Sequence, residues 1–189
     1  MVSCLLELPS GELVSGSGGL WDKKIRIWDL NEKKCMTILN GHELPITCLI
    51  FVQDLIASSS HDLTIKLWNK WSNECVRTLK GHSEVVYHLE TTKNLLISCS
   101  GDKSIRFWSL DADSYECVRV LNCVHEASVC CIKVNPYNED HLLSRSYDKT
   151  LRMWSITTGE CLLSIQTESK YVFKICNIEF IDNVKCPII

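Results

Sequence analysis

The feature of this sequence that most restricts its fold is a tryptophan that recurs at a nearly constant interval. Trp28, Trp68, Trp108 and Trp154 are separated by 40, 40 and 46 residues, and an aspartate stands six residues before each of them. Between each aspartate and its tryptophan, apolar and polar residues alternate, which is the period of a half-buried β-strand. A fixed period of this length indicates a series of similar supersecondary units that stack on their neighbours.

Each repeat predicts four short β-strands and no helix. Segments of small and apolar residues precede the aspartates at 13–17, 56–60, 97–100 and 143–146, and another apolar segment follows each tryptophan. Gly41-His42 and Gly81-His82 open the second and third repeats. We therefore divide the chain into repeats at 1–40, 41–80, 81–121 and 122–166, with a degenerate fifth repeat or tail at 167–189.

A period of 40 to 45 residues with four strands, Gly-His and an Asp-then-Trp element resembles the WD-repeat family. The resemblance implies an all-β fold, a WD-repeat β-propeller with four four-stranded antiparallel blades and a C-terminal stub. The first repeat lacks its Gly-His, and an insertion at 18–21 displaces Asp22. The fourth repeat has Val124-His125 instead of Gly-His, and residues 171–175 are expected to begin a fifth unit.

The resemblance also implies a hydrogen-bonded tetrad in each complete blade. A buried aspartate is tolerated only when it is paired, and histidine and serine supply the donors. The tryptophan adds a large apolar body and one N–H group that needs an acceptor. The expected sets are His42, Ser58, Asp62 and Trp68; His82, Ser98, Asp102 and Trp108; and His125, Ser144, Asp148 and Trp154, while the first repeat keeps Ser15, Trp28 and, as a candidate, Asp22.

Serine, histidine and aspartate also suggest a hydrolase, but their repetition argues against one. A hydrolase uses one exposed nucleophile beside an oxyanion hole, whereas this set recurs three times, each time with a tryptophan. The sequence has no phosphate-binding glycine loop, no H-E-x-x-H motif and no paired C-x-x-C motifs. We therefore expect a protein that is not an enzyme and that needs no cofactor and no metal.

The chain contains twelve cysteines, most of which follow the repeat. Those that follow a tryptophan by seven to nine residues are Cys35, Cys75, Cys117 and Cys161, and those that share another position are Cys4, Cys48 and Cys131. Equivalent positions in successive repeats lie too far apart for a disulfide. We expect these cysteines to be small buried hydrophobic residues in a reducing compartment.

In the WD-repeat family the binding surface is usually the face around the channel entrance. The residue before each tetrad aspartate and the start of each innermost strand form that face. Carried onto this chain, the set is Pro45, Thr47, His61, Val85, Tyr87, Gly101, Ser128, Cys130 and Tyr147. Tyr87, Tyr147 and His61 are the strongest candidates, because aromatic residues dominate interface hot spots. The alternative is that all of them are ordinary turn residues.

Two further tryptophans fall outside the repeat position. Trp21 lies in the insertion of the first repeat, and Trp71 lies in a polar turn between the expected third and fourth strands. Each is either folded back onto its blade or offered to a partner as an exposed anchor, since exposure is unfavourable for so large an apolar group.

These observations predict an intracellular scaffold or adaptor, cytoplasmic or nuclear, that binds other proteins or peptides. No apolar run approaches the ~20 residues that span a bilayer, so no membrane partner is expected. One alternative is the substrate receptor of a ubiquitin ligase, because residues 74–82 resemble the F-box/WD proteins. The expected binding face holds no arginine, which weakens phosphopeptide recognition. The other alternative is an RNA-processing propeller, which the net charge of −3 disfavours.

The number of repeats leaves ring closure open. Propellers have about four to eight blades, and the family resemblance implies roughly seven for most members. Open blade faces would be prone to aggregation, as the apolar strand at 46–52 illustrates. The chain is therefore expected to be a fragment of a longer protein, a protein that completes its ring by self-association through open blade edges, or a closed four-bladed ring.

Overall fold

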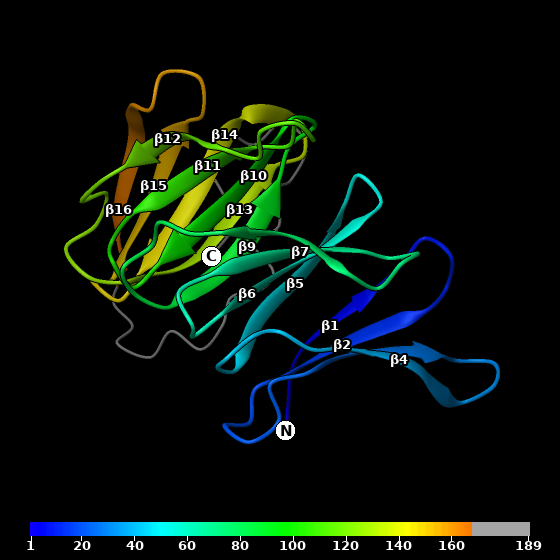
Figure 1. Ribbon diagram of the computed structural model, residues 1–189. Helices are drawn as coiled ribbons and strands as arrows, with labels where there is room; N and C mark the ends of the chain where they lie inside the picture. Colours follow the sequence, from blue (N-terminus) through cyan, green and yellow to red (C-terminus); the bar gives the residue numbers. More distant parts are fainter. Residues whose placement is uncertain (168–189) are drawn as a thin grey trace.

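The computed structural model describes residues 1–167, which form sixteen β-strands in four sheets (Figure 1). The expected fifth unit at 171–175 lies outside the described residues. Within residues 1–167 there is no helix, so no helical segment there could cross a membrane. The predicted all-β class is confirmed.

The four sheets are termed blades 1 to 4. Blade 1 consists of β1 (Val2–Glu7), β2 (Leu13–Ser17), β3 (Ile25–Asp29) and β4 (Lys34–Leu39). Blade 2 consists of β5 (Ile46–Val52), β6 (Leu55–Ser60), β7 (Ile65–Asn69) and β8 (Cys75–Leu79). Blade 3 consists of β9 (Val86–Thr91), β10 (Leu95–Ser100), β11 (Ile105–Ser109) and β12 (Cys117–Leu121). Blade 4 consists of β13 (Val129–Asn135), β14 (Asn138–Ser146), β15 (Thr150–Ser155) and β16 (Cys161–Gln166).

Every blade is an antiparallel meander in which strands pair in chain order. The innermost strands β1, β5, β9 and β13 contact one another in the same order, so the blades follow one another from blue to orange in Figure 1. Turns β2–β3, β6–β7, β10–β11 and β14–β15 lie at one end of the blades, which we term the upper face. Turns β1–β2, β3–β4 and their equivalents lie at the opposite, lower end.

Apolar side chains between neighbouring blades form the core. Successive residues of a strand point to opposite faces of its sheet, so each blade contributes to two seams. In the seam between blades 1 and 2, Trp68 packs with Ile25, Ile46 and Ile56, and it is 2% exposed. Trp108 and Trp154 occupy the corresponding places in the next two seams. The recurring tryptophan therefore packs one blade on its predecessor.

The expectation that the cysteines are buried is wrong for those on the outermost strands. Cys35, Cys75 and Cys161 are exposed, and the Sγ of each lies 3.4 Å from the backbone oxygen two residues later. Each pairs with the repeat tryptophan at a β-bulge, where the register shifts by one residue. An outermost strand is covered on fewer sides than an inner strand, so these thiols reach the surface. Cys48 and Cys131, on innermost strands, are buried, whereas Cys4 and Cys117 are half-buried.

Candidate functional site

In blade 2 the four tetrad residues form a continuous chain of hydrogen bonds. Trp68 Nε1 donates to Ser58 Oγ at 2.8 Å, and His42 Nε2 lies 2.7 Å from the same oxygen. His42 Nδ1 lies 2.6 Å from Asp62 Oδ2. A neutral histidine with its proton on Nδ1 satisfies every group, because the tryptophan donates to the serine, the serine to the histidine and the histidine to the carboxylate.

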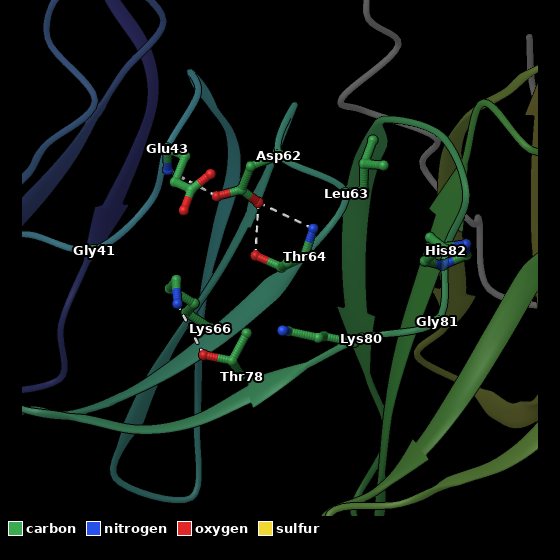
Figure 2. Close-up of a pocket in the computed structure, with 10 residues that line it drawn as sticks. All are labelled: Gly41, Glu43, Asp62, Leu63, Thr64, Lys66, Thr78, Lys80, Gly81 and His82. Atoms are coloured by element: carbon green, nitrogen blue, oxygen red, sulfur yellow. Dashed lines mark hydrogen bonds between the residues drawn. The ribbon is translucent and has the colours of Figure 1, made fainter.

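Further donors from the β6–β7 turn and from the segment before β5 surround the aspartate, as Figure 2 shows. Asp62 Oδ1 accepts hydrogen bonds from the backbone N–H and the hydroxyl of Thr64, at 3.0 and 2.6 Å, and Oδ2 accepts one from the Glu43 N–H at 3.0 Å. Burial opposes ionisation of this carboxyl, but the donors outweigh it and hold the pKa of Asp62 well below its usual value. The aspartate therefore remains an anion that fixes the turn.

Blades 3 and 4 repeat this arrangement. In blade 3, Trp108 Nε1 donates to Ser98 Oγ at 2.9 Å, and His82 lies 2.8 Å from both Ser98 Oγ and Asp102 Oδ2. In blade 4, Trp154 Nε1 donates to Ser144 Oγ at 2.8 Å, and His125 lies 2.7 Å from Ser144 Oγ and 2.9 Å from Asp148 Oδ2. Burial opposes ionisation of Asp148, but hydrogen bonds from Thr150 and Glu126 lower its pKa to about 2. Burial also lowers the pKa of His125, despite the opposing effect of Asp148.

The tetrads leave no nucleophile that a substrate could reach. Ser58, Ser98 and Ser144 are fully buried, and each hydroxyl already bonds a tryptophan and a histidine. A catalytic serine needs an exposed oxygen beside an oxyanion-binding group. In the part of the chain that the structure describes, no group of histidine, cysteine, aspartate or glutamate side chains could hold a metal ion. The geometry of the tetrads is that of internal braces.

Blade 1 departs from this pattern. Trp28 Nε1 donates to Ser15 Oγ at 2.8 Å, as in the other blades. Asp22 instead forms a two-point ion pair with Arg26, at 2.9 and 3.1 Å, and the hydrogen bond from Arg26 lowers the pKa of Asp22. The candidate role of Asp22 in a tetrad is therefore wrong. Without a histidine beside it, the carboxylate pairs with the nearest cation.

On the upper face, six of the nine residues expected to bind a partner line one pocket. They are Pro45, Thr47, His61, Tyr87, Cys130 and Tyr147, and the other lining residues are Met1, Ser3 and Gly18 of blade 1, Ile46 and Cys131. The Tyr87 and Tyr147 rings meet edge to face, with centroids 6.3 Å apart and planes at 89°. The pocket therefore draws on all four blades, and two aromatic rings from neighbouring blades meet in its wall.

Val85, Gly101 and Ser128, the remaining residues of the set, take part in backbone hydrogen bonds on the same face. Gly101 N–H donates to Val85 O at 2.9 Å, and Tyr147 N–H donates to Ser128 O at 3.1 Å. The equivalent bond in blade 2 joins His61 to Pro45 at 3.0 Å. Each bond ties the residue before a tetrad aspartate to the segment that leads into an innermost strand. The tetrads thus hold the upper loops in fixed positions.

The exposed fractions of these side chains differ. His61 is exposed and Tyr147 is 52% exposed, whereas Tyr87 and Thr47 are half-buried. Pro45 is buried, so its side chain offers little surface to a partner. Burial raises the pKa of Tyr87, and Tyr147, Cys130 and Glu84 add to the effect. The tyrosines therefore present neutral phenol groups at the mouth of the pocket.

Arg145 on β14 is a buried charged residue that was not predicted from the sequence. It is 4% exposed, and its Nε and Nη1 atoms have no hydrogen-bond partner within residues 1–167. The first three blades carry Gly16, Ser59 and Cys99 at the same register position. An arginine inside a segment of small residues was the available signal. Its charge lies close enough to Cys130 to lower the pKa of that thiol, although burial raises it overall.

Trp21 and Trp71 are both exposed, so neither is folded back onto its blade. Trp21 is 98% exposed in the β2–β3 turn at the upper face, and Trp71 is 74% exposed in the β7–β8 turn at the lower end. The two tryptophans therefore cannot belong to one contact surface on a single face.

Comparison with known families identifies the repeat. The family model described as "WD domain, G-beta repeat" matches residues 1–29, 33–69, 73–109 and 115–155. Each match ends with the third strand of a blade, and from the second match on each begins with the outermost strand of the preceding blade. Together these matches cover more than half of the chain.

Curated relatives share the repeat at moderate identity. Mitochondrial division protein 1 of Coccidioides immitis is 38% identical over 159 residues, and that of Aspergillus clavatus is 30% identical over 159 residues. Each match covers 84% of this chain but only 22% of the relative, so this chain spans about a fifth of their length. The guanine nucleotide-binding protein subunit beta of Schizosaccharomyces pombe is 39% identical over 51 residues, 27% of this chain and 16% of that protein.

A solved structure has the same fold. A chain from the crystal structure of the mitotic checkpoint complex superposes with a TM-score of 0.78 and 22% sequence identity. The match covers 89% of this chain and 52% of that chain. At this identity the likeness concerns the fold alone.

Proposed function

The chain belongs to the WD-repeat family, and from that premise we propose that it is a non-catalytic scaffold that binds a protein partner through the upper pocket of its blades. Members of this family are typically protein-interaction scaffolds and generally non-catalytic. The observation that carries the proposal is the meeting of Tyr87 and Tyr147 in a pocket lined by all four blades. Aromatic side chains that a partner covers on binding supply much of the binding energy in protein interfaces.

The construction of the upper face supports rigid presentation of its loops. The tetrad aspartates Asp62, Asp102 and Asp148 fix the turns that carry His61, Gly101 and Tyr147. A loop held in its bound conformation loses little conformational entropy on binding. The tetrads therefore act on binding indirectly, by keeping the contact residues in position.

The lining of the pocket favours an ordinary protein partner over the two alternatives. Among the described residues that line it, none is a lysine or an arginine. Phosphopeptide receptors and RNA-binding proteins place basic groups at the contact surface, because they must neutralise phosphate. Arg145, whose charge acts on Cys130 of the pocket, is buried. The resemblance of residues 74–82 to F-box/WD proteins is the support for a ubiquitin-ligase substrate receptor, and the composition of the pocket adds none for it or for an RNA-processing propeller.

An intracellular site of action is part of the proposal. Cys35, Cys75 and Cys161 are exposed thiols on the outermost strands. Exposed unpaired cysteines suit a reducing compartment, where they are kept as thiols.

Photo-cross-linking in cells tests the binding face. A photoreactive phenylalanine analogue replaces Tyr147 in one variant and Tyr137 in a matched variant. Tyr137 is 61% exposed in the β13–β14 turn at the lower end, so it controls for an exposed tyrosine of the same blade. The proposal predicts discrete protein adducts from position 147 that disappear when Tyr87→Ala is added. Equal adducts from both positions, or none from position 147, would contradict it.

A further inference from the structure

At the lower end of the blades, two positions close each seam between neighbouring blades. The first position belongs to the earlier blade of the seam: in its second strand one residue pairs with the repeat tryptophan, and the position is the residue just before it. The second position belongs to the later blade and is the second residue after its repeat tryptophan. In the seam between blades 2 and 3 these are Leu55 and Leu110, which are 8% and 4% exposed in one apolar cluster. In the seam between blades 3 and 4 they are Leu95 and Ile156.

The seam between blades 1 and 2 has a charge pair at these two positions. Glu12 stands at the position that Leu55 and Leu95 occupy in blades 2 and 3. Lys70 stands at the position that Leu110 and Ile156 occupy in blades 3 and 4. Lys70 Nζ lies 4.2 Å from the centroid of the Trp71 ring and 5.4 Å from that of Phe51, so it is held by two aromatic rings. Glu12 Oε2 is buried and accepts no hydrogen bond within residues 1–167, whereas hydrogen bonds from the Ser10 side chain and the Glu12 backbone lower the pKa of the carboxyl group as a whole.

Because no apolar pair fills this seam, a groove of about 290 Å³ opens between the two blades. We term it the lower groove. Leu8 and Ile27 are its buried apolar residues, and Met36 and Trp71, 53% and 74% exposed, lie at its edge. The remaining lining residues are Ser10, Glu12, Thr37, Lys70 and Asn73. The groove therefore combines an apolar floor, an exposed tryptophan and two opposite charges.

We propose that the lower groove is a second docking site, which takes an uncharged peptide segment of a protein partner with one aliphatic side chain. That side chain packs on the apolar floor that Leu8 and Ile27 form. The peptide group beside it donates its N–H to Glu12 Oε2 and accepts from Lys70 through its carbonyl oxygen. Trp71 and Met36 cover the side chain from outside.

The two charges determine this choice of ligand. An acidic side chain in the groove would be attracted by Lys70 but repelled by Glu12, and a basic side chain would meet the reverse. A peptide group carries one donor and one acceptor, so it complements both residues. The buried Glu12 Oε2 atom accepts no hydrogen bond within residues 1–167, and a ligand that supplies an N–H group would give it a donor.

A displayed library of random twelve-residue peptides tests the proposal on the full chain. Peptides are selected on the wild-type protein and counter-selected on the double variant Glu12→Leu, Lys70→Leu, which restores the apolar pair of the next seam. We expect enriched peptides that share an aliphatic residue flanked by uncharged residues. They should bind Trp71→Ala at least tenfold more weakly than the wild type, as measured by calorimetry.

Two controls separate this site from the upper pocket. Trp21→Ala removes an exposed tryptophan at the upper face, and Tyr87→Ala with Tyr147→Ala removes the aromatic pair there; neither should change the affinity of the selected peptides. Failure to enrich any peptide against the counter-selection, a consensus of charged residues, or equal binding to Trp71→Ala would overturn the proposal. Should the double variant fail to fold, selection against Trp71→Ala alone gives the same decision.

Discussion

Blade 1 and blade 2 have the same strand order and the same hydrogen bond from tryptophan to serine. They differ in the sheet face that would contact a preceding blade. In blade 2, Ile46 and Leu49 on β5 are 1% and 5% exposed, because blade 1 covers them. Their counterparts in blade 1, Val2 and Leu5, are 59% and 61% exposed. The same strand pattern thus yields a core where a preceding blade exists and an apolar surface where the structure describes none.

The tetrads show the same difference at the level of single side chains. Asp62 of blade 2 joins a histidine, a hydroxyl and two backbone N–H groups. Asp22 of blade 1 stands at the same spacing before its tryptophan but pairs with Arg26 at the surface. The aspartate therefore becomes a buried brace only when the segment entering the blade supplies the histidine. The comparison predicts that equivalent substitutions have different costs in the two blades.

Removal of the repeat tryptophan is the largest expected effect. Trp68→Ala empties a site that is 2% exposed and should lower the free energy of unfolding by about 3–5 kcal/mol. Trp28→Ala should cost clearly less, because Trp28 is only half-buried and borders an open groove lined by Val2, Leu5 and Leu30. Urea unfolding followed by circular dichroism measures both. Equal losses would show that blade 1 is covered in solution as blade 2 is.

Removal of the aspartates should give the next largest difference. Asp62→Ala strands the N–H of His42 and the donors of Thr64, which should cost about 1–3 kcal/mol. Asp22→Ala breaks an ion pair at the surface, where the loss should stay below about 1 kcal/mol. The same unfolding measurement applies. A loss for Asp22→Ala as large as that for Asp62→Ala would mean that blade 1 has a buried brace after all.

The pH dependence of stability should originate in the tetrads. The pKa of His125 is lowered from its ordinary value of 6.5, so the unfolded chain binds a proton more readily than the folded one. The free energy of unfolding should therefore fall as the pH drops from 7 to 5. The carboxyl of Asp148, with a pKa of about 2 against an ordinary 3.8, adds a further loss only below about pH 4.

Urea unfolding at pH 7, 6 and 5 measures this effect in the wild type and in His125→Asn. The variant should be less stable at pH 7 and should lose less stability on acidification. Blade 1 has no tetrad histidine and makes no contribution of this kind. A pH dependence that is unchanged in His125→Asn would place its origin elsewhere.

The repeat made much of the fold predictable from the sequence. The alternation before each tryptophan depends on local residues, and the all-β class and the blades follow from it. The resemblance to the WD-repeat family, applied to the recurring spacing, named the tetrad residues, and in blades 2 to 4 they lie within hydrogen-bonding distance.

What escaped prediction depends on neighbours that are distant in the sequence. Cys75 is exposed because it lies at a bulge on an outermost strand, which the repeat alone does not show. Glu12 and Lys70 look like ordinary turn residues until the seams are superposed on one another. The burial of Arg145 was also not predicted, because it depends on the side chains packed against that face of β14. The residues at the same position in the other three blades are small and gave no precedent for it.

The central claim is that partners bind the upper pocket, and affinity measured by calorimetry tests it most directly. A protein captured from position 147 is titrated into the wild type, into Tyr87→Ala with Tyr147→Ala, and into Tyr137→Ala. Removal of both aromatic hot spots should reduce the binding free energy by about 1.4 kcal/mol or more, which weakens binding at least tenfold. We predict that loss for the Tyr87 and Tyr147 variant and an unchanged affinity for Tyr137→Ala. Unchanged affinity for both variants would contradict the claim.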